Sequence, residues 1–186
     1  MEPNLKERIF GLDALRATAI LMVVSSHVLW IYPKSNAFIP TLFELFGFWG
    51  VELFFVLSGF LIGSILYKKF INENFTLKSV FHFLKRRWFR TLPNYYLVLI
   101  LNILIAFFLG FSIENAGSYF LFLQNFASKS PAFFPESWSL SIEEFTYLLL
   151  PFSLFFVGLS KMKDKSKLFL LVIVALILVF WMNKFI

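Results

Sequence analysis

Residues Leu45–Tyr67 read LFGFWGVELFFVLSGFLIGSILY, and they are the clearest indication of the fold class of the chain. Its 23 residues include one charged side chain, that of Glu52. About 20 apolar residues, each rising about 1.5 Å along a helix, are enough to cross the hydrocarbon core of a membrane. The stretch therefore predicts a transmembrane helix.

The composition of the whole chain points the same way. Of its 186 residues, 59% are hydrophobic and 15% are charged, whereas soluble domains are roughly half apolar and a quarter charged. The net charge of +6 does not indicate a nucleic-acid partner, because the apolar runs leave no soluble face to carry a basic surface. The chain has no cysteine, which excludes disulfides, thiolate nucleophiles and cysteine-bound metals, and we expect no metal site. We predict an all-α, polytopic transmembrane helix bundle in which residues 1–186 form one membrane domain.

Four further segments have the length and composition of membrane spans, which makes five in all. They are Ile9–Trp30, Leu92–Phe111, Trp138–Leu159 and the segment from Leu168 to the C-terminus. The apolar stretch Tyr119–Phe126 is too short to cross and is expected at the interface or as a re-entrant segment. Before the third span, Phe75–Leu92 has apolar residues at helical spacing and predicts an interfacial amphipathic helix. Attraction of its cations to anionic lipid would explain most of its charge.

The connecting loops predict the orientation of the chain in the membrane. Cations in loops mark the cytoplasmic side, and here 13 lie on one side and two on the other. The N-terminus is therefore expected in the cytoplasm, with the chain as a multi-pass protein of the inner (cytoplasmic) membrane. The 13 cations are Lys6, Arg8, Lys68, Lys69, Lys78, Lys85, Arg86, Arg87, Arg90, Lys161, Lys163, Lys165 and Lys167, and the two are Lys34 and Lys129.

The first span carries three ionisable side chains, Asp13, Arg16 and His27. A charge inside a span costs about 2.5 to 3.5 kcal/mol on insertion scales, so the presence of each of these side chains requires an explanation. Arg16 and His27 are 11 residues apart, which returns them to within roughly 20° of one helical face, and Asp13 can pair with Arg16. One alternative is a purely structural role, with an Asp13–Arg16 pair at the headgroups and His27 bonded to a neighbouring helix.

The second span contributes Glu52 and, six residues later, Ser58 followed by Gly59. A carboxyl group at this depth either stays protonated or pairs with a cation, and His27 is the expected partner. Ser58 lacks the Gly-x-Ser-x-Gly context of a hydrolase nucleophile. We therefore favour close helix packing through the small residues Ser58 and Gly59.

The fourth span opens with Trp138 and places Glu143 and Glu144 at the edge of its apolar zone. Trp138 suits a membrane interface. The helix dipole favours a carboxylate near the N-terminus, but this accounts for only one of two adjacent Glu residues that point in different directions. Pro151 lies in mid-span and is expected to kink the helix.

Four motifs in this order resemble the N-terminal half of the acyltransferase 3 family of integral membrane O-acyltransferases. They are Gly11–Ala17 (GLDALRA) with His27; Gly50–Ile62 (GVELFFVLSGFLI); Arg87 and Arg90 ahead of Pro93; and Trp138–Glu144 (WSLSIEE), continuing to Tyr147 and Pro151. The chain departs from the family at Glu52, where Asp is usual, and at Thr146, where an aromatic residue is usual. Family members also have more spans than the five expected here, so a further chain supplying the missing helices is an expected partner.

The resemblance implies transfer of an acyl group, most often acetyl from acetyl-CoA, to a hydroxyl of a cell-surface carbohydrate. His27 can act as the general base because its ordinary pKa lies near neutrality, or it can carry the acyl group as a covalent intermediate. Arg87 and Arg90 are expected to bind the phosphates of acyl-CoA, with Arg16 holding the donor more deeply. Glu143 is expected to orient His27 or contact the sugar. Supporting or substrate-binding roles fall to Asp13, Glu52, Ser58, Trp138 and Glu144.

Two other classes of protein are also compatible with these sequence features. A transporter or proton-relay protein would also carry ionisable side chains within its spans, but inverted repeats would distinguish it and the sequence contains none. A non-catalytic membrane fragment or subunit would be expected to lose these side chains, and this chain retains them.

Overall fold

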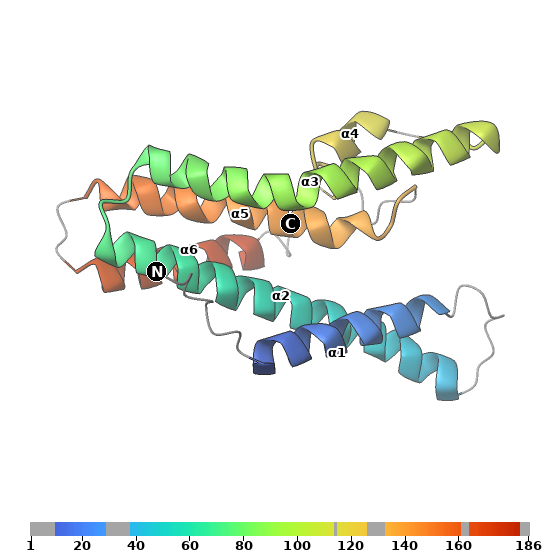
Figure 1. The fold of residues 1–186 in the computed structure, drawn as a ribbon, viewed down its shortest axis with the longest axis horizontal. Helices are drawn as coiled ribbons and strands as arrows, with labels where there is room; N and C mark the ends of the chain where they lie inside the picture. Colours follow the sequence, from blue (N-terminus) through green and yellow to red (C-terminus); the bar gives the residue numbers. More distant parts are fainter. Residues whose placement is uncertain (1–9, 29–37, 114, 126–132, 161–163, 183–186) are drawn as a thin grey trace, which may run out of the picture. The chain divides into compact units, whose positions relative to one another are not determined.

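The computed structural model describes residues 10–28, 38–113, 115–125, 133–160 and 164–182, and these residues fold into six helices without a strand (Figure 1). The expected all-α fold is thereby confirmed. Of the loop and terminal cations, Lys6, Arg8, Lys34, Lys129, Lys161, Lys163 and Lys184 lie outside the described residues. The helices are α1 (Phe10–His27), α2 (Phe38–Asn72), α3 (Leu77–Phe108), α4 (Ala116–Phe120), α5 (Ser137–Gly158) and α6 (Lys165–Met182).

Three of these helices, α2, α3 and α5, are long and apolar enough to cross a membrane, judged over the described residues. They correspond to the second, third and fourth of the five expected spans. The first and fifth expected spans fall on α1 and α6, each of which is 18 residues long. Because three of its helices have the length and apolar composition of membrane spans, the chain is a membrane protein.

The helix boundaries differ from the sequence expectation in the middle of the chain. Helix α2 begins seven residues before Leu45 and continues five residues past Tyr67, for 35 residues in all. The expected interfacial helix and the expected third span form one continuous helix, α3, with Pro93 in its interior. Pro151 likewise lies inside α5, where it cannot donate a main-chain hydrogen bond to the carbonyl of Tyr147. The helix continues to Gly158 because the turns on either side of the proline keep their own hydrogen bonds.

The chain divides into two compact units, residues 1–65 and 66–186, which are described separately. In the first unit, α1 packs against α2 at glycines. A Cβ atom built on Gly50 would lie 2.9 Å from the carbonyl oxygen of Ala19 and 2.8 Å from Cγ2 of Val23, and one on Gly47 would lie 2.5 Å from Oγ of Ser26. Small residues let membrane helices approach closely and gain van der Waals contact. Ala19 is accordingly fully buried.

In the second unit, α5 packs against both α3 and α6, and the short α4 lies along α3 (Figure 1). The fully buried side chains of this unit come from α2, α3 and α5. Many other apolar side chains of α3 and α6 remain exposed, as expected of helices that face lipid. The buried set includes Leu66, Phe70, Val80, Leu84, Leu99 and Leu154.

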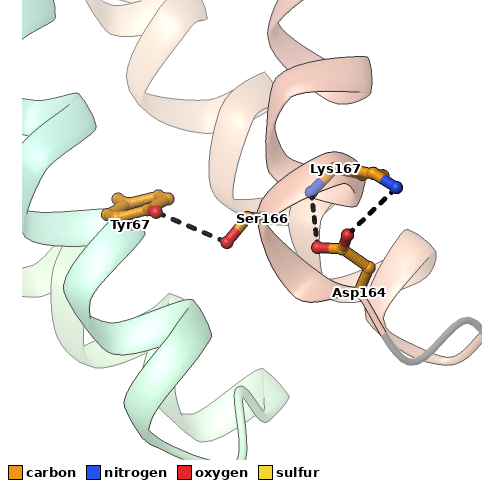
Figure 2. Close-up of polar contacts among 4 residues, drawn as sticks. All are labelled: Tyr67, Asp164, Ser166 and Lys167. Atoms are coloured by element: carbon orange, nitrogen blue, oxygen red, sulfur yellow. Dashed lines mark hydrogen bonds and ion pairs between the residues drawn. The ribbon is translucent and has the colours of Figure 1, made fainter.

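The C-terminal end of α2 is tied to the start of α6. Nζ of Lys165 donates hydrogen bonds to the main-chain carbonyls of Ile71 (3.3 Å) and Glu73 (3.1 Å), which places a cation at the negative end of the α2 dipole. The hydroxyl of Tyr67 lies 3.4 Å from that of Ser166, and this contact is drawn in Figure 2.

Asp164 precedes α6 and interacts with its first turn, as Figure 2 also shows. Its Oδ1 accepts a hydrogen bond from the main-chain N–H of Lys167 (3.1 Å), and its Oδ2 lies 3.4 Å from Nζ of the same residue. The main-chain N–H of Lys167 lowers the pKa of the Asp164 carboxyl, because that hydrogen bond favours the charged form.

The apolar stretch that begins at Tyr119 folds as the end of α4 followed by turns, and its last expected residue, Phe126, lies outside the described residues. Its main-chain carbonyls accept hydrogen bonds from side chains of the long helices. The hydroxyl of Tyr95 donates to Tyr119 O (2.8 Å) and that of Tyr96 to Phe120 O (3.0 Å). Irregular backbone near a membrane needs such partners, because lipid offers none.

The glycine contact between α1 and α2 leads to a stability prediction. Gly50→Ala should destabilise the protein, because overpacking costs about 1 to 3 kcal/mol and outweighs the roughly 0.5 to 1 kcal/mol that alanine gains over glycine in a helix. Gly63→Ala in the same helix is the matched control, since its Cβ would meet nothing within 4 Å. The midpoints of denaturation in detergent should fall for the first variant and hold or rise for the second. Equal shifts in the two variants would contradict the close contact.

Candidate functional site

An ion pair forms near the N-terminal end of α1. Nη1 of Arg16 donates to Oδ1 of Asp13 at 2.9 Å, three residues apart on the helix. The expected pairing is confirmed. The side chains are 38% and 48% exposed, respectively, so the pair is accessible to headgroups or to a ligand.

His27 is the last residue of α1, and its ring is held by a main-chain carbonyl. Its Nδ1 lies 2.7 Å from the carbonyl oxygen of Val23. A carbonyl oxygen only accepts hydrogen bonds, so Nδ1 carries the proton of the neutral ring and Nε2 is its basic nitrogen. Ser26 lies beside the ring, with Oγ 3.4 Å from Nδ1, and donates to the same Val23 carbonyl at 2.7 Å.

The second-span residues Glu52 and Ser58 differ in how far their side chains are exposed. Glu52 is exposed on α2 and Ser58 is half-buried. A Glu52–His27 pair is not among the ion pairs that the structure records for the described residues. A Cβ atom built on Gly59 would meet nothing within 4 Å, so the described residues show no close helix contact at this glycine. The close helix contact instead forms at Gly47 and Gly50, because those glycines face α1.

Glu144 forms the main polar link of the second unit. It is 6% exposed, and each of its carboxyl oxygens accepts a hydrogen bond from α3. Nε1 of Trp88 donates to Oε2 at 3.0 Å, and the hydroxyl of Thr91 lies 3.0 Å from Oε1. The same hydroxyl lies 3.1 Å from the carbonyl oxygen of Arg87, so its single proton serves one acceptor at a time. The arrangement joins α5 to α3 and compensates the carboxyl group for burial.

Glu143 points elsewhere. It is half-buried, and its Oε2 accepts a hydrogen bond of 3.0 Å from the hydroxyl of Tyr147, one turn further along α5. The two adjacent Glu residues therefore have separate environments, as the sequence suggested. Trp138 lies in the first turn of α5, 37% exposed, and its main-chain carbonyl accepts a hydrogen bond from the Asn125 side chain at 2.8 Å.

The two arginines of α3 also differ. Arg90 is exposed, whereas Arg87 is half-buried, with its guanidinium carbon 5.8 Å from the ring centre of Phe83 and 5.6 Å from that of Tyr147. Stacking on aromatic rings suits a guanidinium group, which is planar and weakly hydrated. Arg87 thus lies between α3 and α5, close to the Glu144 link.

Sequence reasoning did not assign roles to Trp88 and Thr91, which the structure brings to Glu144. Their three-residue spacing, which puts the indole N–H and the hydroxyl on one side of a helix, was the available signal. The partner across the bundle could not be read from spacing, because it lies more than 50 residues away along the chain. Over the described residues, no group of three or more His, Asp or Glu side chains is placed to hold a metal ion.

Comparison with known proteins identifies relatives over nearly the whole chain. YrhL of Bacillus subtilis strain 168, provisionally named a peptidoglycan O-acetyltransferase, is 33% identical over 177 residues, which cover 85% of this chain and 25% of YrhL. The peptidoglycan O-acetyltransferase OatA of Listeria monocytogenes is 30% identical over 185 residues, covering 89% of this chain and 27% of OatA. The O-acetyltransferase OatA of Staphylococcus aureus is 30% identical over 188 residues, covering 90% of this chain and 28% of that protein.

The chain spans about a quarter of the length of these curated relatives. No solved structure matches it. A family model described as an acyltransferase domain matches residues 9–185, a range that includes every motif discussed above. The chain therefore belongs to the family that this acyltransferase domain defines.

Proposed function

We propose that this chain forms membrane helices of an O-acetyltransferase, which moves an acetyl group from acetyl-CoA to a hydroxyl of a cell-surface carbohydrate. Peptidoglycan is the acceptor we favour, because it is the acceptor in the names of two relatives. The observation that carries the proposal is the contact between Nδ1 of His27 and the Val23 carbonyl. In a member of an acyltransferase family, this contact makes Nε2 a general base of defined tautomer.

The proposed reaction assigns proton transfer to His27. Nε2 removes the proton from the acceptor hydroxyl as its oxygen attacks the thioester carbonyl of acetyl-CoA. The carbon–sulfur bond then breaks, and the CoA thiolate takes up the proton that His27 holds. The products are the acetyl ester and free CoA, so the histidine ends as it began.

The donor would be held by arginines. Arg87 and Arg90 present forked guanidinium groups, which match the geometry of phosphate oxygens. Arg16 is a further donor-binding candidate, and its pair with Asp13 would fix the guanidinium at 2.9 Å from the carboxylate while other N–H groups remain for a ligand. Glu52, Ser58, Trp138 and Glu143 remain candidates for supporting the site or binding the acceptor.

CoA is a cytoplasmic metabolite with several negative charges, which fits an N-terminus in the cytoplasm. This orientation puts the α3 cations Lys78, Lys85, Arg86, Arg87 and Arg90 on the side from which the donor arrives. We accordingly propose that the chain lies in the inner membrane with its N-terminus inside.

The base assignment predicts the effect of His27→Ala. Acetyl transfer should fall by about 10² to 10⁴, the usual contribution of general base catalysis, while the protein still inserts into the membrane. The measurement is release of free CoA thiol from acetyl-CoA, in membranes that contain the protein and an acceptor glycan. Ser26→Ala is the control, since it changes the neighbouring residue and leaves the imidazole in place.

Two outcomes would count against this proposal. Substantial turnover by His27→Ala would remove the base assignment. No turnover by the parent protein would favour the non-catalytic alternative.

The donor assignment predicts the effect of changing Arg87 and Arg90 together to Lys. The positive charge is kept, so attraction to anionic lipid should persist, but the forked donors are lost. The KM for acetyl-CoA should rise about tenfold or more, as expected when about 1.4 kcal/mol of binding is removed. Lys85→Arg with Arg86→Lys serves as a control that also exchanges cations on α3. An unchanged KM in the Arg87/Arg90 variant would leave lipid anchoring as the role of this pair.

The orientation predicts the location of reporter domains fused at helix ends. Fusions after Lys69 and after Asp164 should report the cytoplasm, and a fusion after Gly110 should report the opposite face. The readouts are alkaline phosphatase, which is active outside, and a fluorescent protein that matures inside. A cytoplasmic signal for the Gly110 fusion, or an external one for Lys69, would contradict this topology.

A further inference from the structure

The guanidinium group of Arg87 is held between two buried aromatic rings. Phe83, one turn earlier on α3, is 5% exposed, and Tyr147 on α5 is 4% exposed. The ring centres lie 5.8 Å and 5.6 Å from the guanidinium carbon. The cation is thereby fixed by groups from both helices.

Arg87 has no carboxylate within ion-pair distance in the part of the chain that the structure describes. The two ion pairs recorded there involve other residues, and the hydrogen bond recorded for Arg87 is accepted by its main-chain carbonyl. The carboxylate of Glu144 attracts the Arg87 guanidinium through space, but its recorded hydrogen bonds come from Trp88 and Thr91. An aromatic ring offers no lone-pair acceptor, so a guanidinium group held by two rings still has N–H donors to give to an anion. A half-buried arginine held in this way is suited to bind an anion.

Tyr147 is itself fixed by a second contact. Its hydroxyl donates to Oε2 of Glu143 at 3.0 Å, one turn away on the same helix. The ring is therefore constrained at its hydroxyl end and by its burial between α3 and α5. Glu143 is thereby linked to Arg87 through the Tyr147 side chain.

We propose that Tyr147 is a positioning residue for the acyl donor, because its ring, together with that of Phe83, holds the Arg87 guanidinium ready to bind a phosphate group of coenzyme A. The inference rests on the proposed function and deepens its donor site. The ring of Tyr147 makes the contact, and its hydroxyl serves mainly to orient the ring. Tyr147 acts through Arg87 and need not touch the donor.

The test measures binding of coenzyme A to the purified protein in detergent by isothermal titration calorimetry. Tyr147→Leu removes the ring and should weaken binding about 3- to 30-fold, the range expected for loss of a cation–π contact. Tyr147→Phe keeps the ring and should bind within about twofold of the parent. Arg87→Gln should weaken binding at least as much as Tyr147→Leu, because it removes the charge itself.

A double variant shows whether Tyr147 acts through Arg87. In the Arg87→Gln background, adding Tyr147→Leu should cost almost nothing further, since the group that it positions is already absent. Independent, additive losses would overturn the proposal. In turnover assays Tyr147→Leu should raise the KM for acetyl-CoA and leave the KM for the acceptor glycan unchanged.

A matched control separates positioning from folding. Tyr119 is equally buried, at 4% exposed, and belongs to the same unit but not to the contacts of Arg87. Tyr119→Leu should leave coenzyme A binding unchanged. If Tyr147→Leu does not fold, Phe83→Leu tests the other ring and should also weaken binding.

The outcomes distinguish this inference from the proposed function. A parent protein that does not bind coenzyme A would refute the donor assignment itself. A parent that binds, with Arg87→Gln weakened and Tyr147→Leu unchanged, would overturn the positioning role alone. Equal losses in Tyr147→Phe and Tyr147→Leu would also overturn it, because the hydroxyl rather than the ring would then matter.

Discussion

A buried carboxyl group on a membrane helix must find hydrogen-bond donors, and the second unit of this protein is organised around that constraint. Glu144 receives one donor from Trp88 and one from Thr91, both on α3. A single interhelical hydrogen bond in a membrane contributes on average about 0.6 kcal/mol, whereas leaving the group without partners would cost several kcal/mol. The bonds therefore matter chiefly because they specify the register in which α5 lies against α3. That register brings Tyr147 to Arg87.

The two units use different devices to pair their helices. In the first, Gly47 and Gly50 let α1 approach α2 until backbone and side-chain atoms are in contact. In the second, polar side chains connect the helices, including Glu144 and the two tyrosines that bind the carbonyls beside α4. Both devices suit a lipid environment, in which apolar burial alone does not drive helices together.

Two independent kinds of observation support the proposed function, namely the family match and the contacts of individual side chains. The match to the acyltransferase domain identifies the family over residues 9–185. The contacts of single residues add detail to the proposed catalytic roles. The Val23 carbonyl defines the tautomer of His27, and the Asp13 carboxylate orients Arg16. Relatives named as O-acetyltransferases supply the acyl group and the acceptor class for the proposal. The proposed donor site rests on the phosphate-binding geometry of arginine and on the aromatic rings that contact Arg87.

The all-α membrane class, the family and the Asp13–Arg16 pair could all be predicted from the amino-acid sequence. These depend on composition, on ordered motifs and on residues three apart on one helix, all of which are local properties. The sequence also predicted that Glu143 and Glu144 point in different directions, which their separate hydrogen bonds confirm. The sequence missed the full length of α2 and the continuity of α3 through Pro93, because helix ends depend on neighbouring turns rather than on apolarity. The folded structure was needed to show that Glu144 contacts Trp88 and Thr91, that Tyr147 contacts Arg87, and that the close helix contact is at Gly50 rather than Gly59. Each of these joins residues from two helices, and hydrophobic spacing says which face of a helix is apolar but not which partner that face will meet.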